Sequence, residues 1–317
     1  MRRTTMTLTQ LEYFVAVVEE GSISAAATAL HVAQSTVSTA VAHLERAVGC
    51  ELLRRTPGQG TAPTPTGQVL LGDARRLLAA AVDIEELPQR MRDEVVGQLA
   101  VGCYRTIAPV FLPPVLTELW RRHPELTVTV HEGDVAAIVD LLRTGVCEVA
   151  VTYDLDLPGD IEMTPMARLR PYAVVAPDHP CAGRGSVRLA ELTTIAGGAM
   201  VFLDLPDTAR FMDRVLAAAG ARPARYLRMG SFETMRGLVA AGAGFAIINQ
   251  RLGTDQTSAG GRVVPLRIED DIPTVAVGLC RPVGAQRTGR AAVLEAVLRT
   301  VVADAGRAVA GGEHPAP

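Results

Sequence analysis

The chain has 317 residues, of which 48% are hydrophobic and 21% charged, so a mostly disordered protein is excluded and the length fits about two domains. The formal net charge is -3, and this near-neutral balance does not by itself indicate a nucleic-acid or a membrane partner. The longest apolar run, from 237 to 248, is too short and too rich in glycine to span a bilayer.

The first segment predicts three short helices separated by tight turns. Thr9 and Glu12 form a capping-box pattern, and the apolar residues that follow at helical spacing end at Gly21. Ser22 is a suitable cap for a second helix, and a third helix is expected from about 35 to 48. Two short helices joined by a tight turn, the second with a small polar face, are typical of a helix-turn-helix.

The third helix and the segment after it carry the candidate DNA contacts. Polar side chains on its early turns can hydrogen-bond base edges in a major groove or hold phosphates, although Ser and Thr also favour helix starts without any partner. Residues 56–67 are dense in Pro, Gly and Thr and predict a hairpin-like wing. The candidates on the helix, before the wing and in it are Gln34, Ser35, Thr36, Ser38, Thr39, Arg54, Arg55 and Gln59.

A longer helix is expected from 68 to 91. Its apolar residues recur at seven-residue intervals at Leu70, Leu77, Ile84 and Met91. A narrow seam of this kind suits pairing with a second long helix, and packing on the helix's own domain is the alternative. Pro88 is expected to end or kink the helix.

From Gly97 onward, short apolar strands alternate with amphipathic helices, which is typical of a parallel α/β sheet. The predicted strands are 99–102, 127–130, 149–153, 173–176, 200–203, 245–249 and 275–280. The predicted helices are 108–122, 135–144, 207–219, 232–241 and 290–303. A tail from 306 to 317, rich in Gly and Pro near its end, is expected to be disordered.

Ligands of open α/β sheets sit at the carboxyl ends of the strands, and several loops there carry polar and aromatic residues. Arg105 and helix N-termini could hold a carboxylate, whereas Asp134, Asp207 and Glu233 could cap helices or favour a cationic group. The aromatic residues could be cleft walls or core. The candidate effector-binding residues are Tyr104, Arg105, Thr106, Asp134, Tyr153, Leu205, Pro206, Asp207, Phe232, Glu233 and Thr234.

Enzyme and metal chemistry have little support in the sequence. Hydrolase elbow, P-loop, zinc-protease and dinucleotide-binding motifs are missing, and the six histidines are scattered. The five cysteines are widely separated, which argues against disulfides and zinc, and no nearby cysteine supports a redox role for Cys103. We therefore expect no catalytic residue, metal or cofactor, and a cytoplasmic location because no signal peptide is visible.

In the first segment, recognisable motifs occupy 11–14, 21–27, 30–38, 44–45, 49, 52–53, 55 and 63–67. In the second part they occupy 97–102, 123–126, 145–150, 231–233 and 238–245. The order and spacing of these motifs resemble the LysR-type transcriptional regulators over roughly residues 6 to 303. Three features depart from the family pattern: Ala33 in place of a Ser or Thr, Thr39 in place of an Arg or Lys, and a wing without its usual arginine.

The resemblance implies an α/β protein in three parts: a winged helix-turn-helix (1–67), a linker helix that builds dimers (68–96), and a two-lobed domain (97–305) similar to periplasmic binding proteins. Lobe I would comprise 97–165 and 268–305, and lobe II 166–267. It also implies a sequence-specific transcriptional regulator, not an enzyme, controlled by a small-molecule effector between the lobes. Its partners would be promoter DNA, RNA polymerase and further copies of the chain, as a homodimer or homotetramer, with no membrane partner. A solute-binding protein or a protein-binding adaptor is the alternative.

Overall fold

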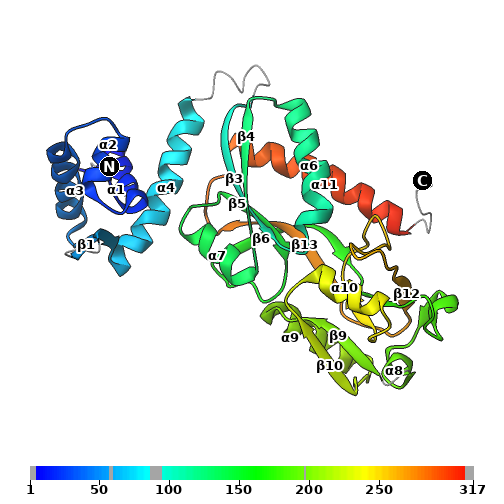
Figure 1. Cartoon of the computed structure of the whole chain (residues 1–317). Helices are drawn as coiled ribbons and strands as arrows, with labels where there is room; N and C mark the ends of the chain where they lie inside the picture. Colours follow the sequence, from blue (N-terminus) through cyan, green and yellow to red (C-terminus); the bar gives the residue numbers. More distant parts are fainter. Residues whose placement is uncertain (1–4, 57–59, 86–94, 196–197, 311–317) are drawn as a thin grey trace.

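The computed structural model describes residues 5–56, 60–85, 95–195 and 198–310, and for 56 and 303–310 it describes the backbone alone. The N-terminal helices form a separate small body, and α4 joins it to an α/β domain of two lobes (Figure 1). Each body has its own cluster of buried apolar side chains. We call the small body the head, and the two halves of the α/β domain lobe I and lobe II.

Three helices build the head: α1 (Leu8–Glu20), α2 (Ile23–Ala29) and α3 (Gln34–Val48). The capping box of α1 lies at Thr7 and Gln10, two residues before the predicted pair, because this pair offers the same spacing and lets the helix begin earlier. Ser22 caps α2 as predicted, with its hydroxyl accepting from the Ala25 N–H. Ala33 precedes α3 without a side-chain cap, so the departure seen in the sequence is a real gap in the capping.

The predicted wing is a two-stranded antiparallel hairpin, β1 (Leu53–Thr56) and β2 (Gly60–Pro63). It is fastened to the turn between α1 and α2, where the Thr61 N–H donates to the Gly21 carbonyl over 2.7 Å. Gly60 has a φ of 87°, and a Cβ there would lie 2.7 Å from the same carbonyl oxygen, so the close approach requires glycine. Gln59 lies outside the described residues.

The linker helix α4 runs from Pro65 to Glu85, beginning three residues earlier than predicted. Thr64 explains the early start, because its hydroxyl accepts from the Gly67 N–H and proline is favoured at the first helical position. Of the seam, Leu70 packs on the head core, whereas Leu77 and Ile84 are 46% and 71% exposed. The first described part of the seam therefore packs within the chain, and the second faces outward, where pairing with another helix stays a prediction. Pro88 and Met91 lie outside the described residues.

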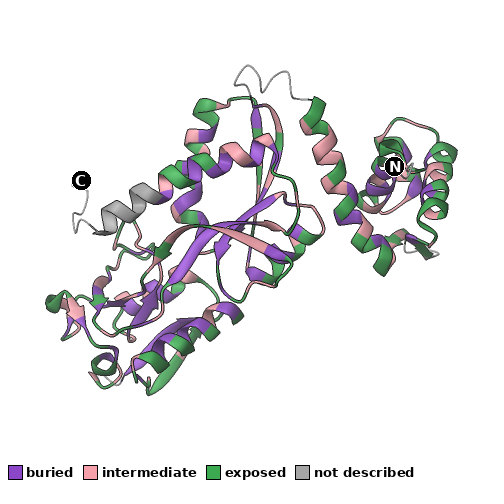
Figure 2. Cartoon of the chain, turned by 180° about the vertical axis from the view of Figure 1, so that it is seen from behind, coloured by how far each residue is buried: buried purple, intermediate pink, exposed green. Residues whose placement is uncertain are grey.

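Lobe I is built on a five-stranded sheet in the order β4-β3-β5-β13-β6. The first three strands are parallel, and β13 runs antiparallel to both of its neighbours. The strands are β3 (Gly97–Tyr104), β4 (Leu126–Gly133), β5 (Val149–Tyr153), β6 (Ile161–Leu169) and β13 (Val275–Pro282). The helices of this lobe are α6 (Ala108–Arg122), α7 (Val135–Arg143) and α11 (Gly289–Ala310). Figure 2 shows the buried residues concentrated on this central sheet.

Lobe II holds a four-stranded sheet in the order β11-β7-β12-β8 and the parallel pair β9–β10. Its strands are β7 (Tyr172–Val175), β8 (Ser186–Val187), β9 (Ala199–Leu203), β10 (Arg225–Met229), β11 (Ala246–Ile248) and β12 (Val264–Ile268). Its helices are the short η1 (Ala182–Arg184) and α8 (Leu189–Leu192), then α9 (Pro206–Ala218) and α10 (Phe232–Ala240). All seven predicted strands are present, whereas β6, β8, β10 and β12 were missed.

The chain crosses between the lobes at 170–171 and 269–274, not at 165 and 268 as predicted. Pro165 lies inside β6, because β6 is an edge strand and Pro165 faces Gly278 beside an irregularity in the ladder, where a missing N–H is tolerated. The expected disordered tail from 306 is also wrong as far as Ala310, because α11 continues to that residue. Residues 311–317 lie outside the described part.

Helix α4 also contacts lobe I, at a junction with the C-terminal end of α7 that we call the α4–α7 junction. One Arg75 nitrogen donates to the Thr144 carbonyl and another bonds Glu19 of α1, both over 2.8 Å. Arg76 donates to the Arg143 carbonyl over 3.3 Å. A Cβ on Gly72 would lie 2.0 Å from that carbonyl oxygen, so glycine is what lets the two helices meet.

Candidate DNA-binding face and effector cavity

Helix α3 presents one polar and one apolar side. Its apolar side packs into the head core through Val37, Val41 and Leu44. Of the predicted contacts, Ser38 is half-buried and the other four are exposed: Gln34, Ser35, Thr36 and Thr39. An exposed row of hydrogen-bonding side chains on a short helix can be laid against a base edge in a major groove.

The wing stands beside this helix because of Glu45, near the end of α3. The Leu52 and Leu53 N–H groups both donate to one carboxylate oxygen of Glu45, over 2.9 and 3.2 Å. This fixes β1 to α3 and leaves Arg54 and Arg55 exposed on β1. Glu45 was not predicted as a site residue, and its place in the Leu44-Glu45 motif was the available signal.

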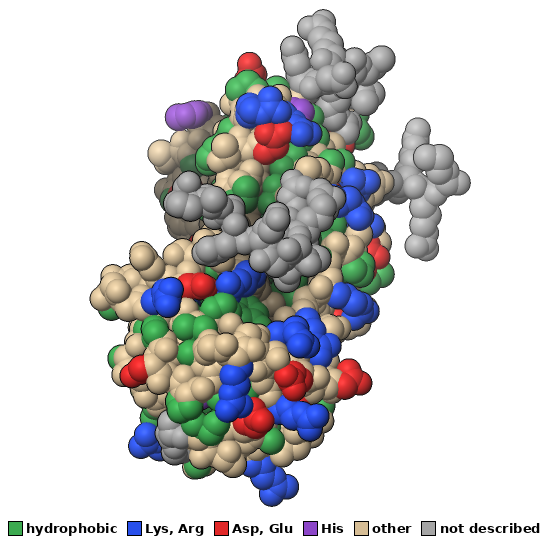
Figure 3. Space-filling model, turned by 90° about the vertical axis from the view of Figure 1, so that its right-hand side faces the viewer, with side chains coloured by type: hydrophobic (Ala, Val, Ile, Leu, Met, Phe, Trp, Pro, Cys, Tyr) green, Lys and Arg blue, Asp and Glu red, His purple; other side chains and the backbone are tan. Residues whose placement is uncertain are grey.

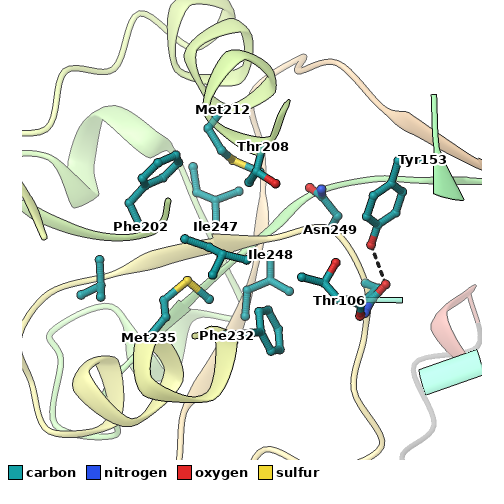
Figure 4. Close-up of a pocket in the computed structure, with 13 residues that line it drawn as sticks. Thr106, Tyr153, Phe202, Thr208, Met212, Phe232, Met235, Ile247, Ile248 and Asn249 are labelled. Carbon is teal, nitrogen blue, oxygen red and sulfur yellow. Dashed lines mark hydrogen bonds between the residues drawn. The ribbon is translucent and has the colours of Figure 1, made fainter. Parts of the chain in front are cut away.

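A cavity that is partly open to solvent lies between the lobes, and its empty space is about 430 Å³ when the solvent at its mouth is included. Lobe I contributes Thr106 and Tyr153, and lobe II contributes the rest (Figure 4). The lining residues of lobe II are Val201, Phe202, Leu203, Thr208, Met212, Phe232, Met235, Ile247, Ile248, Asn249 and Gln250.

Hydrogen bonds cross between the lobes at the edge of this cavity. The Tyr153 hydroxyl donates to the Gln250 side-chain carbonyl over 2.5 Å, and the Gln250 amide nitrogen donates to the Thr106 carbonyl. The Tyr104 hydroxyl and the Thr208 hydroxyl are 2.9 Å apart. Burial raises the pKa of Tyr104 to about 12, and burial likewise raises the pKa of Tyr153, so both phenols stay protonated near neutral pH. Near neutral pH these hydrogen bonds join uncharged groups, and ion pairs of Asp156 in lobe I with Arg210 and Arg214 of α9 also join the two lobes.

The structure brings three of the predicted effector residues to the cavity wall: Thr106, Tyr153 and Phe232. Tyr104 lies behind the wall, where it is buried against Tyr153 with the ring centroids 5.3 Å apart. Leu205 is buried outside the lining, and the exposed residues outside the lining are Arg105, Pro206 and Thr234.

The three predicted acids have partners within the chain. Asp134 caps α7 by accepting from the Ala137 N–H, Asp207 pairs with Arg210 over 2.8 Å, and Glu233 pairs with Arg236 over 2.9 Å. The Ser258 N–H also donates to Glu233. Of the predicted alternatives, the helix cap therefore describes Asp134, whereas Asp207 and Glu233 are paired with arginines of their own helices, which was not predicted from the sequence.

Sequence reasoning missed Asn249 and Gln250. Both residues follow β11, a strand that was predicted from the sequence. Because ligands bind at the carboxyl ends of strands, the position of these two residues could have identified them. Thr208 and Met212 of α9 and Met235 of α10 also line the cavity. Helical spacing could have predicted them only with knowledge of which face of each helix points to the cavity.

Four of the five cysteines are buried, and Cys50 is half-buried. Burial, with a smaller contribution from Glu132, raises the pKa of the Cys103 thiol well above its ordinary value. Burial raises the pKa of Cys147 and of Cys280 to about 12. No cysteine is among the residues that line the cavity, so within the described residues the cleft holds no thiol.

Two further classes of site find no support in the described ranges. Their helices include none that is both long and apolar enough to cross a bilayer. Their His, Cys, Asp and Glu side chains form no group of three placed to hold a metal ion.

Two family models match the chain. The model described as "LysR substrate binding domain" matches residues 92–303, and "Bacterial regulatory helix-turn-helix protein, lysR family" matches residues 8–68. The chain belongs to the LysR family. It is a DNA-binding transcriptional regulator with an effector-binding domain, and not an enzyme. The fold inferred from the resemblance, a helix-turn-helix head followed by a LysR effector domain, is confirmed.

Relatives and solved structures place the chain in the same family. The chain is 29% identical over 309 residues to a probable hydrogen peroxide-inducible genes activator of Streptomyces viridosporus, covering 96% of each protein. It is similar to a full-length OxyR variant from Pseudomonas aeruginosa, with a TM-score of 0.74, 26% identity, and coverage of 93% of this chain and 98% of that one. It is also similar to HinK, a LysR family regulator from the same species, with a TM-score of 0.60, 29% identity, and coverage of 93% and 98%.

Proposed function

We propose that two or four copies of this chain place paired α3 helices in successive major grooves of promoter DNA. The observation that carries the proposal is the exposed polar side of α3, with the wing fixed beside it by Glu45. Base contacts are assigned to the α3 candidates, and backbone contacts to Arg54, Arg55 and Gln59. The exposed apolar residues in the second half of α4, Leu77, Val82 and Ile84, are the proposed dimer contact of the linker, with residues 1–67, 68–96 and 97–305 as the three functional parts.

A small molecule in the cavity between the lobes is the proposed signal. Because both lobes line the cavity and hydrogen bonds join them across it, a bound ligand favours one lobe arrangement. The α4–α7 junction offers a contact through which lobe I can bias the position of the head. RNA polymerase is the proposed partner at the promoter, and the bacterial cytoplasm is the proposed location.

The test is binding of the full chain to the intergenic DNA upstream of its own gene, followed by fluorescence anisotropy against a scrambled duplex of equal length. Specific binding by a dimer or tetramer, with the stoichiometry set by analytical ultracentrifugation, is the expected result. Equal affinity for both duplexes, or a monomer at saturating DNA, would contradict the proposal.

Replacing Arg54 and Arg55 by alanine is expected to weaken binding to both duplexes alike. Each phosphate that an arginine no longer neutralises lowers the slope of log K against log salt by about 0.9, so a dimer without these four arginines changes by about 3.6. The measurement is the affinity across a salt series. Arg222 and Arg225, both exposed in lobe II, provide a matched pair of arginine-to-alanine changes that should leave the slope unaltered. An unchanged slope in the wing variant would remove Arg54 and Arg55 from the DNA interface.

Sensing of hydrogen peroxide by a thiol is the second candidate, because several relatives are named hydrogen peroxide-inducible genes activators. The nucleophile toward peroxide is the thiolate, and burial keeps the thiols of Cys103, Cys147 and Cys280 protonated at neutral pH. We therefore expect peroxide to leave these three cysteines and the DNA affinity unchanged.

Intact-mass spectrometry after iodoacetamide treatment measures this directly. The folded chain should be alkylated at Cys50 at most, the Cys50→Ser variant not at all, and the denatured chain at all five cysteines. Trapping of a sulfenic acid on Cys103 in the folded protein would reinstate the redox hypothesis.

A further inference from the structure

The cavity between the lobes has an apolar and a polar end. Apolar side chains from β9, α9, α10 and β11 fill one side, among them Phe202, Met235 and Ile247 (Figure 4). Asn249, Thr106 and Tyr153 lie together at the other side. Methionine adapts its shape easily, so Met212 and Met235 allow this wall to fit a rigid ring.

No lining residue carries a formal charge. The acidic residues nearby already have partners, because Asp134 caps helix α7 and the other two are paired with arginines. Arg105 is exposed and lies outside the lining. Basic and acidic side chains are interspersed over the face shown in Figure 3. A carboxylate entering the cavity would give up its hydration without gaining a cationic partner, which is strongly unfavourable.

Among the buried side-chain nitrogen and oxygen atoms of the described wall residues, one has no hydrogen-bond partner. The Oδ1 atom of Asn249, the single asparagine of the sequence, is buried and accepts no hydrogen bond, whereas both polar atoms of the neighbouring Gln250 side chain have a partner. A buried acceptor without a donor is unfavourable, so this atom is complementary to a ligand that brings an N–H or O–H group.

We propose that the cavity takes a neutral, largely apolar ligand of one or two rings, whose N–H or O–H group donates to Asn249 Oδ1. This inference rests on the proposed function, in which the same cavity is the effector site. The cavity is bounded by side chains of both lobes and partly open to solvent, so the proposal is limited to a small ring system. The anionic effector that Arg105 suggested in the sequence has no cation to meet in this cavity.

The test uses two pairs of nearly isosteric probes on the full-length chain, followed by NMR of ¹³C-methyl methionine. Benzamide and benzoate differ in charge, and indole and benzofuran differ in a single N–H donor. Met212 and Met235 report on the cavity, their signals being assigned with Met→Leu variants, while Met6 and Met163 lie outside its lining and serve as internal controls. Concentrations up to about 10 mM cover the Kd range of fragments this small.

Benzamide and indole should shift only the Met212 and Met235 signals, benzoate should bind at least about tenfold more weakly than benzamide, and benzofuran about three- to tenfold more weakly than indole. In Asn249→Leu the preference for indole over benzofuran should fall to about one, with benzofuran still bound. The probe pairs on the unchanged protein test the proposal even where this variant does not fold.

Three outcomes would overturn the proposal: benzoate binding as tightly as benzamide, indole binding no better than benzofuran, or no shift at Met212 and Met235 with any probe. Benzoate binding that disappears in Arg105→Ala would restore the anionic site. Promoter binding is measured on the same samples. If promoter binding holds while the probe results fail, only the ligand class falls. Loss of specific promoter binding in the unchanged chain would instead contradict the proposed function.

Discussion

A chain in which Gln34 and Ser38 are both replaced by alanine is expected to bind its operator about a thousandfold more weakly than the unchanged chain. Both residues lie on the polar side of α3, one helical turn apart. A good base contact contributes about 1–3 kcal/mol, so removing two such side chains at each of two half-sites, taken at about 1 kcal/mol each, weakens binding by about 4 kcal/mol. The measurement is the Kd for the operator and for scrambled DNA at one salt concentration.

The affinity for scrambled DNA should change little, because the arginines that contact phosphates stay in place. His43→Ala is the matched control, since His43 is exposed on the same helix and nine residues, or about 180°, away from Gln34. It should alter operator affinity by no more than about twofold, within the usual range of a surface substitution. Undiminished operator binding by a folded double variant, with the helix content of the unchanged chain, would exclude α3 as the recognition helix.

The head was predictable because its signals are local. Ser22 caps α2, and Gly21 and Gly49 end α1 and α3 in the left-handed conformation, all within a few residues of sequence. The error at the start of α1 shows the limit of such signals. Two overlapping capping boxes stood two residues apart, and only the helix itself selected between them.

The lobes were harder to read, because their edge strands lack the expected pattern. Among the described strands, β10 pairs only with β9, and it exposes Arg225, Tyr226 and Arg228. Its sequence is therefore polar and lacks the apolar pattern of the strands that were predicted. In β6, Pro165 suggested a break, but an edge strand with an irregular register accommodates it. Which lobe a strand joins depends on pairing over a hundred residues of sequence, and no local pattern carries that information.

The effector cavity shows the same division between local and long-range information. The acids that looked like ligands had short-range partners that could have been read, since Arg210 and Arg236 each follow an acid by three residues. The vacant acceptor on Asn249 could not be read in that way. Gln250 hydrogen-bonds to Tyr153 and Thr106 of the opposite lobe, and Asn249 Oδ1 is left without a donor. These contacts join residues about a hundred or more positions apart, so no local pattern predicts them.

Gly72→Ala is expected to destabilise the protein by about 1–3 kcal/mol, although glycine-to-alanine in a helix interior ordinarily stabilises by about 0.8–1.0 kcal/mol. The new Cβ would lie 2.0 Å from the Arg143 carbonyl oxygen, so α4 has to move away from α7. That movement breaks the hydrogen bonds that Arg75 and Arg76 donate to carbonyls at the end of α7. Urea denaturation followed by circular dichroism measures the stability, and small-angle scattering should show a larger radius of gyration as the head separates.

Gly237→Ala is the matched control, because Gly237 also lies inside a helix, α10, but has nothing within 4 Å of its added Cβ. This variant should gain about 0.8–1.0 kcal/mol and keep the radius of gyration. Because both variants replace a helical glycine by alanine, opposite changes in their free energies of unfolding separate the effect of the α4–α7 contact from the effect of helix propensity. If both variants gained stability to the same degree, the Arg75 bridge between Glu19 of the head and Thr144 of lobe I would not hold the two bodies together in solution, and a ligand in the cavity would need another route to the head.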